Sequence, residues 1–341
     1  MVRTRNVSAG TTEPRVSVLT PFYNSDASLV ECIESVLAQT YGNFEYLLVN
    51  NCSTDRSLEI AESYRQRDPR IRVLQNPVFL TQIQNYNQAL GNTSPDSRYI
   101  KIVQADDAIF PHCLSDMVAL AEAHPTVGVV SSYRMNGSSV EPPRVMPHTK
   151  TVMSGREAGA LYITEGLYLL GTQTTVLMRA DLVRRRQPFY PEGRVYADSD
   201  ALYDILLDCD FGFVHQILSF TRVDEESIYG RNLDYRPDLL CQLITLKTYG
   251  SRYLTPDELA RHGEAFERRY RRFLAEAWLA RREPAFWELH REGLRTVGED
   301  IDKARLLRDV AATVLHYAVR PHTVVGKLLR HVRGRAPGPQ G

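Results

Sequence analysis

Two adjacent carboxylates end an apolar run near residue 100. The stretch "YIKIVQADD" passes from the apolar residues 100–103 into Asp106 and Asp107. Neighbouring carboxylates repel each other unless water, a proton or a cation lies between them. A solvated turn meets that requirement, and so does a divalent cation, because Mg²⁺ and Mn²⁺ prefer oxygen ligands. The pair alone therefore leaves a plain turn and a metal site both open.

The segments around this pair alternate between strand and helix patterns. Apolar, β-branched runs predict strands at 15–20, 44–50, 71–74, 98–103 and 127–133, and helical spacing lies between them. Short links between alternating elements imply a mostly parallel sheet flanked by helices on both faces. Ligands of such sheets bind at the carboxyl ends of the strands. Asp106 and Asp107 lie at one such end, and Asn50 and Asn51 at another, so we expect both pairs to face one crevice.

Local signals predict where several helices begin. Ser28 with Glu31 forms a possible capping box, and Ser53 is a candidate N-cap. Pro111 suits the first turn of a helix that runs to about residue 123. The sequence "TPDE" predicts a helix start with Thr255 as its N-cap.

The rest of the chain changes character. Strand patterns at 174–179, 211–214 and 217–222 continue the α/β region, with a helical pattern between them that begins near Asp198. Beyond Pro237 the pattern is wholly helical. We therefore expect four parts, which are a disordered N-terminal segment (1–14), an α/β domain (15–235), a C-terminal helical region (236–333) and a disordered tail (334–341).

Composition narrows the class of protein. The 341 residues carry 41 Lys+Arg and 41 Asp+Glu, so net charge gives no reason to expect a nucleic-acid partner. Five cysteines without a CxxC pair are typical of a reduced, cytoplasmic protein. The first residues lack the apolar core of a secretory signal, and no apolar run approaches the length of a membrane span.

The turn after the first strand excludes some nucleotide-binding classes. It reads "TPFYNSDAS" and contains no glycine, whereas a dinucleotide-binding Rossmann turn and a P-loop both need glycine to bring phosphate near the backbone. A nucleotidyltransferase remains an alternative, although it would favour a glycine-rich, basic turn here for a triphosphate. Phosphates in this crevice would need another neutralising group, and a metal on Asp106 and Asp107 would supply it.

Four blocks, in order, resemble the inverting nucleotide-sugar glycosyltransferases of family 2, which have the GT-A fold. The resemblance covers about residues 15–228. The blocks are "VLTPFYN", "YLLVNNCSTDRS", "YIKIVQADD" and "YADSDALYDILL". It implies a GT-A (Rossmann-like) catalytic domain, a nucleotide-sugar donor, a glycan or lipid-linked acceptor and a role in surface-polysaccharide assembly.

The resemblance also assigns roles to residues of the acidic blocks. Asp107 is the expected ligand of Mn²⁺ or Mg²⁺, and Asp106 holds the ribose or assists the metal. A carboxylate on the far side of the sugar must take the proton of the attacking hydroxyl. Asp198 is the expected general base, with Asp200 as the alternative, and either acid could instead only cap the following helix.

Further residues are expected to bind the nucleotide sugar. Asn51 stands where the family usually has the Asp that reads uracil, which favours UDP without excluding another base. Thr20, Pro21 and Tyr23 should line the same end of the sheet, with Tyr23 packing beside the base or in the core. Arg222 is expected to face the phosphates, unless it is simply exposed.

The chain departs from the family pattern at several positions. Gln104 replaces the first acid of the D-x-D block, Asn51 replaces an Asp, and Asp224 stands where a His is expected. These departures leave a second class of function open, namely a catalytically inactive module that binds a nucleotide sugar.

The end of the chain is basic. From Lys303 onward there are eight Lys or Arg residues and one acid, Asp309, and "VVGKLLRHVR" is amphipathic. A basic amphipathic helix can lie on an anionic membrane surface. Peripheral contact with the inner membrane face is therefore one hypothesis, and packing of the helix on the protein is the other.

Overall fold

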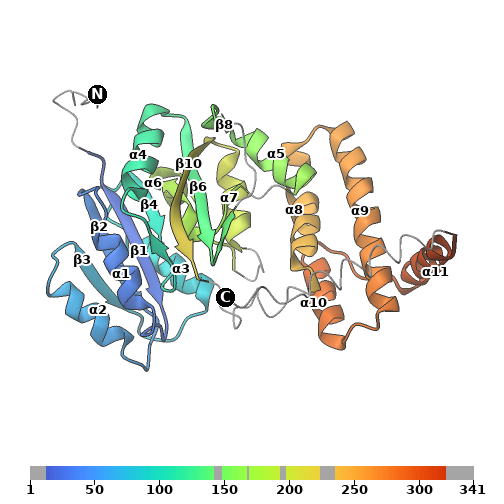
Figure 1. Ribbon diagram of the computed structural model, residues 1–341, viewed down its shortest axis with the longest axis horizontal. Coiled ribbons are helices and arrows are strands. Elements are labelled where there is room, and N and C mark those ends of the chain that lie inside the picture. The colour runs from blue at the N-terminus through green and yellow to red at the C-terminus, as the bar shows by residue number, and fades with distance from the viewer. Residues whose placement is uncertain (1–12, 142–147, 167–168, 193–196, 223–234, 320–341) are drawn as a thin grey trace, which may run out of the picture. The chain divides into compact units, whose positions relative to one another are not determined.

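The computed structural model describes residues 13–141, 148–166, 169–192, 197–222 and 235–319. By its contacts the chain divides into two compact units, 1–230 and 231–341, and each is described by itself (Figure 1). The first unit contains the sheet, and the described part of the second unit is helical.

A mixed sheet of ten strands forms the centre of the first unit. The strands are β1 (Val16–Phe22), β2 (Phe44–Asn50), β3 (Ile71–Gln75), β4 (Tyr99–Ile102), β5 (Ala108–Ile109), β6 (Val127–Asn136), β7 (Ser139–Glu141), β8 (Val152–Ser154), β9 (Leu177–Arg179) and β10 (Asp210–Thr221). Their order is β3-β2-β1-β4-β9-β6-β10-β5, with β7 paired to β6 and β8 to β10. β1 is parallel to β2 and β4, and β6 to β10, whereas β9 runs antiparallel to β4 and β6.

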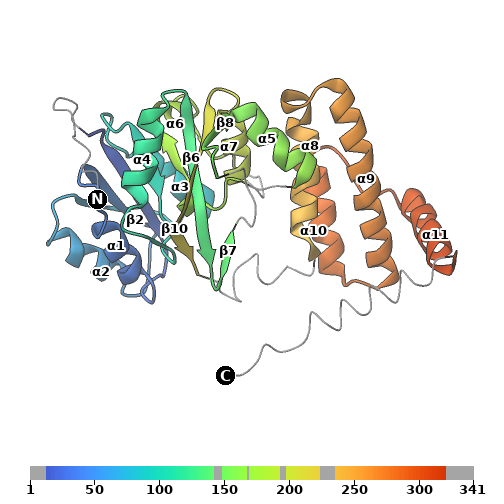
Figure 2. The same ribbon diagram turned by 45° about the horizontal axis from the view of Figure 1, so that its top comes forward.

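Helices flank this sheet (Figures 1 and 2). They are α1 (Leu29–Leu37), α2 (Ser57–Arg65), α3 (Gln82–Gly91), α4 (Cys113–Ala123), α5 (Gly155–Glu165), α6 (Ala180–Arg184) and α7 (Ala197–Leu206), with a 3₁₀ turn, η1, at Gln173–Thr175. The predicted α/β architecture, followed by a helical region, is confirmed. The strand pattern at 174–179 proved to be η1 followed by the short β9, and the two later patterns form one irregular strand, β10.

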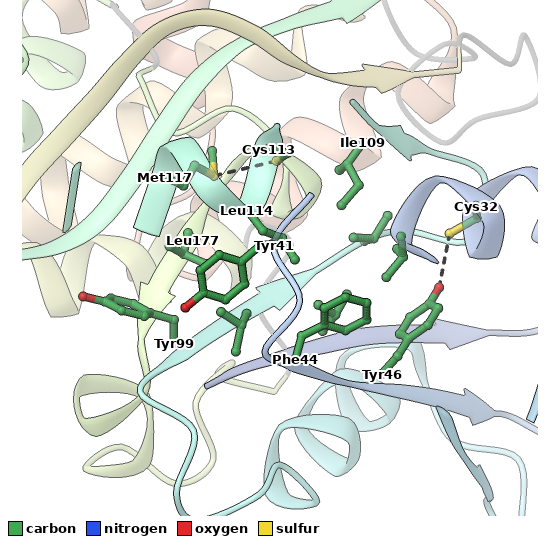
Figure 3. Packing of buried hydrophobic residues seen from close by; sticks show 14 of the residues in the cluster. Cys32, Tyr41, Phe44, Tyr46, Tyr99, Ile109, Cys113, Leu114, Met117 and Leu177 are labelled. Carbon is green, nitrogen blue, oxygen red and sulfur yellow. Dashed lines mark hydrogen bonds between the residues drawn. The ribbon is translucent and has the colours of Figure 1, made fainter. Parts of the chain in front are cut away.

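The main hydrophobic core lies between the sheet and helices α1 and α4 (Figure 3). Tyr46 of β2 is fully buried, and its hydroxyl lies 2.9 Å from Thr20 Oγ1 and 3.8 Å from Cys32 Sγ. Burial raises the pKa of Tyr46 well above its ordinary value. These contacts fix β1 against β2 and α1, and thereby set the positions of the loops that follow both strands.

Two of the predicted helix caps differ from the structure: Ser28 is the N-cap residue of α1 but forms no capping box, and Ser53 is not the N-cap of α2. The side chain of Ser28 makes no capping hydrogen bond, although α1 begins at the next residue. Helix α2 begins only at Ser57, because the hydroxyl of Ser53 accepts a hydrogen bond from the Asn24 amide instead. The predicted helix from Pro111 ends at Ala123 as expected but begins at Cys113.

The second unit contains α8 (Pro237–Tyr253), α9 (Pro256–Leu279), α10 (Pro284–Arg295) and α11 (Lys303–Val319). Thr255 caps α9 with the predicted capping box. Arg271 pairs with Asp309, and Tyr317 donates to Glu276, so α9 and α11 pack side by side in a parallel sense. Within the described residues, no helix is both long enough and apolar enough to cross a bilayer.

His290 of α10 joins three parts of the second unit. Its side chain is fully buried, with Nε2 2.8 Å from the Tyr235 carbonyl and Nδ1 2.7 Å from the Tyr270 hydroxyl. A carbonyl only accepts, so Nε2 carries the proton and Nδ1 accepts from the tyrosine. Burial lowers the pKa of His290 to about 4. The folded unit therefore keeps this ring neutral at pH values where the unfolded chain would protonate it.

This difference predicts a pH-dependent stability. Because the folded pKa lies below the unfolded value, the stabilisation is present above about pH 6.5 and is lost as pH falls towards 4, by about 3 kcal/mol. Both tryptophans, Trp278 and Trp287, lie in this unit, so urea unfolding followed by fluorescence reports on it directly. His290→Gln, which does not titrate, should flatten that part of the pH profile. An unchanged profile in the variant would contradict the assignment.

Candidate active site

The carboxyl ends of four parallel strands meet along one edge of the sheet. Parallel pairing aligns Phe22 with Asn50 and Leu19 with Ile102, so the loops after β1, β2 and β4 are neighbours. β10 runs parallel to β6, which brings the residue after it, Arg222, to the same edge. The predicted grouping of these loops follows directly from the strand order.

Asp107 lies in the turn after β4 and is almost completely buried, with 3% of its surface exposed. Its Oδ2 accepts a hydrogen bond of 2.5 Å from Thr174 Oγ1, and the Arg222 main chain provides a second hydrogen bond. Burial raises the pKa of Asp107 to about 7, and the charge of Asp106 acts in the same direction. Asp106 itself is exposed. This edge of the sheet therefore carries two adjacent carboxylates, buried Asp107 and exposed Asp106.

Thr174 connects Asp107 to the floor of the site. Its Oγ1 accepts from the Gln104 amide at 3.0 Å while donating to Asp107, and its carbonyl accepts from Lys101 Nζ at 2.5 Å. Lys101 is fully buried in β4, and burial lowers its pKa. The sequence gave no sign that Thr174 would contact Asp107 directly.

Tyr86 of α3 shows that three carboxylates converge. Its hydroxyl lies 3.4 Å from Gln104 Nε2. Burial raises the pKa of Tyr86, and the negative charges of Asp106, Asp107 and Asp198 raise it further. One buried phenol therefore lies within the electrostatic reach of both acidic blocks, and no pattern in the sequence pointed to it.

Asp198 and Asp200 lie in the first turn of α7. Asp198 is half-buried, burial raises its pKa, and its Oδ1 accepts from the Ser199 amide at 2.8 Å. Asp200 is buried, with 5% exposed. Residues two apart on a helix do not share a face, so the two carboxylates point in different directions. The charge of Asp198 acts on Tyr86.

A side-chain amide holds the chain just before α7. Asn87 Nδ2 donates to the Tyr190 carbonyl at 2.8 Å, and Asn87 Oδ1 accepts from the Tyr190 amide at 2.9 Å. The ring of Tyr190 also packs edge-to-face on Tyr86, with centroids 6.0 Å apart. α3 therefore restrains the main chain at Tyr190, which precedes Asp198 in the sequence.

Asn51 makes the same kind of two-way contact. Its Oδ1 accepts from the Leu80 amide at 2.9 Å and from Asn76 Nδ2 at 3.0 Å, while its Nδ2 donates to the Leu80 carbonyl at 2.8 Å. Both acceptor positions of Oδ1 are thereby used by the 76–80 loop, and the contact of Asn51 with a nucleotide base stays a prediction. The structure makes Asn51 a support for that loop.

Thr20 lies near the carboxyl end of β1. Its side chain is fully buried and bonds to Tyr46 and the Val103 carbonyl, so its hydroxyl faces the core and does not reach the crevice. Pro21 is buried in β1 beside Val49 of β2. Tyr23, in contrast, is 46% exposed and packs edge-to-face on Phe79, which is itself 62% exposed, with ring centroids 4.9 Å apart.

Arg222 reaches the site through its main chain. Its guanidinium pairs with Glu31 of α1 at 2.5 Å, and both side chains are largely exposed. A phosphate contact from this side chain would require that exposed pair to open, which costs little. Asp224, the position where the family pattern expects a His, lies outside the described residues.

The donor set at this edge suits a hard divalent cation bound partly by its substrate. The described residues contain no group of three His, Cys, Asp or Glu side chains arranged to hold a metal. Mg²⁺-type sites commonly use one or two carboxylates and complete their shell with water and substrate phosphates. Asp106 and Asp107 fit that pattern, since a nearby cation would also offset the cost of burying a charged Asp107.

Comparison with known proteins identifies the family. Residues 17–189 match the family described as "Glycosyl transferase family 2". The chain is 32% identical over 213 residues to "Putative glycosyltransferase EpsE" of Bacillus subtilis, covering 58% of this chain and 74% of that one. It is 34% identical over 120 residues to "Glycosyltransferase GlyG" of Streptococcus pneumoniae, covering 35% of this chain and 38% of that one.

Solved structures show the same fold. S. aureus TarS 1-349 in complex with UDP-GlcNAc is similar with a TM-score of 0.62 at 18% identity, covering 89% of this chain and 87% of that one. The mannosyltransferase PcManGT from Pyrobaculum calidifontis, in complex with GDP-Man and Mn²⁺, gives a TM-score of 0.53 at 17% identity, covering 92% of this chain and 84% of that one. The chain therefore belongs to glycosyltransferase family 2 and is a glycosyltransferase with the GT-A fold.

Proposed function

We propose that this glycosyltransferase uses a divalent cation to transfer a sugar, with inversion, from a UDP-linked donor to a hydroxyl of a glycan or lipid-linked acceptor. The buried carboxylate of Asp107 beside exposed Asp106, at the carboxyl ends of the parallel strands, is the observation that carries the proposal. Among similar folds, one structure holds UDP-GlcNAc and another holds GDP-Man with Mn²⁺, so GDP is the alternative nucleotide. Cell-surface polysaccharide assembly is the proposed setting.

In this proposal each carboxylate has one task. Asp107, assisted by Asp106, holds the cation, which when bound would offset negative charge on the departing diphosphate. Asp198 takes the proton of the acceptor hydroxyl. As the new C–O bond forms on one face of the sugar, the bond to the diphosphate breaks on the other and its electrons leave with the nucleotide. A carboxylate with a raised pKa is a better proton acceptor than an exposed one.

The exposed Tyr23–Phe79 pair is the proposed contact for the base. Its rings present an aromatic edge and face beside the loop held by Asn51. Stacking on such rings tolerates different bases. Selection of UDP over GDP would then depend on main-chain groups of the 76–80 loop, which Asn51 positions.

The metal role can be tested by binding alone. UDP should raise the melting temperature of the wild-type protein only when Mn²⁺ is present, by several degrees at about 100 times Kd. Asp107→Asn should lose that shift, because an amide cannot replace the carboxylate as a charged ligand. Asp96→Asn, an exposed aspartate before the start of β4, serves as the matched control and should keep it. Equal nucleotide stabilisation with and without Mn²⁺ would contradict the metal assignment.

The general base can be separated from its neighbour by two isosteric variants. Asp198→Asn should lower the transfer rate about 10²- to 10⁴-fold and leave donor binding unchanged. Asp200→Asn should have the smaller effect on the rate if its role is structural. The measurement is sugar transfer, or donor hydrolysis where the acceptor is unknown, over a panel of UDP- and GDP-sugars. If Asp198→Asn transfers sugar at the full rate, Asp198 is not the general base. If the wild type transfers no sugar from any donor, the inactive binding module is favoured.

Contact with an anionic membrane through the basic C-terminal part remains a proposal. The segment 320–341 lies outside the described residues. Helix α11, however, buries one face on α9 and exposes apolar residues on the other, at Leu307, Val314, Leu315 and Val319. Near its start, α11 exposes three charged residues, and all are basic: Lys303, Arg305 and Arg308. An apolar face bordered by cations complements an anionic lipid surface.

Vesicle sedimentation tests this surface. The full chain should pellet with vesicles that contain phosphatidylglycerol and remain in solution with pure phosphatidylcholine. Leu315→Glu should weaken binding about tenfold or more, because it removes apolar burial and adds a repelled charge. Ala285→Glu, which adds the same charge to α10, is the control. If Leu315→Glu binds these vesicles as tightly as the control does, the proposed role of α11 is wrong. If a chain ending at Ala318 binds as well as the full chain, the proposed role of the tail is wrong.

A further inference from the structure

Several buried polar atoms of the first unit lack a hydrogen-bond partner. In the described part of the chain they are Arg134 Nη1, Gln173 Oε1, His215 Nδ1, Ser219 Oγ and Thr221 Oγ1. Burying a polar group without a partner costs free energy, and a guanidinium nitrogen costs more than a hydroxyl. Isolated examples occur in many folds, so the grouping of these atoms matters more than their number.

Four of the unpartnered atoms come from the paired strands β6 and β10. His215 lies in the middle of β10, whereas Ser219 lies opposite Arg134 and Thr221 lies opposite Asn136 towards the ends of the strands. The fifth, Gln173, precedes Thr174 in η1, and η1 contacts both strands. Apart from His215, the group therefore gathers at the carboxyl ends of β6 and β10, which is the edge of the sheet that carries the active site.

Arg134 is held by one arm only. Its Nη2 donates to Glu141 Oε2 of β7 at 2.7 Å, while Glu141 Oε1 accepts from Asn136 at 3.1 Å. The side chain is 14% exposed, and Nη1 is shielded from solvent. β7 thus fixes the direction of the guanidinium and leaves the second arm with donors to spare. A purely structural arginine at this position would leave those donors unused at a cost.

The position of the guanidinium links it to the reaction. β10 pairs with β6 at Ser219–Arg134 and with β5 at Phe220–Ala108, and Ala108 directly follows the proposed metal ligand Asp107. Asp107 also has a hydrogen bond to the main chain of Arg222, the residue after Thr221. Nη1 and the two strand hydroxyls therefore lie beside the place where a diphosphate would leave.

We propose that Arg134, with the hydroxyls of Ser219 and Thr221, forms a phosphate-binding site next to Asp107. A charged N–H and two hydroxyls are donors suited to the oxygens of a phosphate. The phosphate belongs either to the diphosphate of the donor or to a phosphorylated acceptor. This inference rests on the proposed function, because it extends the same site. Since Nη1 is shielded in the ligand-free chain, a phosphate reaches it through a local opening.

Calorimetry with two probes that carry no base tests the site in the full chain. Inorganic pyrophosphate with Mn²⁺ represents the donor, and glycerol 3-phosphate without metal represents a phosphorylated acceptor. Arg134→Met should weaken one of the two about 10- to 100-fold, as expected for loss of a charge-assisted hydrogen bond. Arg98→Met is the matched control, since Arg98 pairs with Glu122 just before the start of β4, and it should change neither affinity.

The outcomes separate the two sources of phosphate. A loss confined to Mn²⁺-pyrophosphate assigns the site to the donor, and a loss confined to glycerol 3-phosphate assigns it to the acceptor. Unchanged affinity for both probes in Arg134→Met would overturn the inference and leave Arg134 as an anchor for β7. If that variant does not fold, the double variant Ser219→Ala, Thr221→Val, which keeps the Arg134–Glu141 pair, provides the same comparison with a smaller expected loss.

The proposed function fails differently. If Asp107→Asn binds Mn²⁺-pyrophosphate as tightly as the wild type, the metal assignment is wrong, whatever Arg134 does. If Asp107→Asn loses that affinity and Arg134→Met keeps both affinities, the metal site stands and only the phosphate site is wrong.

Discussion

The rest of the site depends on the burial of one carboxylate, that of Asp107. A charged oxygen shielded from water needs donors at fixed positions, and here they come from Thr174 and from the main chain of Arg222. Thr174 can donate in that direction because its hydroxyl accepts from Gln104 and its carbonyl is held by Lys101. Strand β9 runs antiparallel beside β4, which delivers η1 to the end of β4. The order of the strands therefore determines which side chains reach Asp107.

A second set of contacts brings the other acidic block to the same place. Tyr86 of α3 lies within the electrostatic reach of the three carboxylates, and Asn87, the next residue, holds the main chain of Tyr190 by two hydrogen bonds. Tyr190 precedes Asp198 by only a few residues. One helix thus positions a buried phenol near both acidic blocks and also holds the main chain at Tyr190.

Sequence patterns predicted the helices and strands and the polar residues at the strand ends, but not the buried side-chain contacts of the site. The alternation of strand and helix and the polar pairs at strand ends follow from local residue order, so the sheet and the position of Asp106 and Asp107 at its edge could be anticipated. Asp198 was singled out only by the resemblance to the family. The bond from Thr174 to Asp107 joins residues 67 positions apart, and nothing local to Thr174 marks it. Ser53 failed as a helix cap for the same reason, because its hydroxyl is used by distant Asn24.

The two asparagines that bind main-chain groups in both directions share one chemical requirement. Asn51 and Asn87 each accept from the amide and donate to the carbonyl of the same residue. Each side chain thus forms the pair of main-chain hydrogen bonds that a neighbouring strand would form. Only a carboxamide can do both, since an ionised carboxylate has no hydrogen to give. At position 51, Asn rather than Asp is therefore needed to hold the 76–80 loop by both hydrogen bonds to Leu80. Any influence of position 51 on which nucleotide is selected would therefore act through that loop.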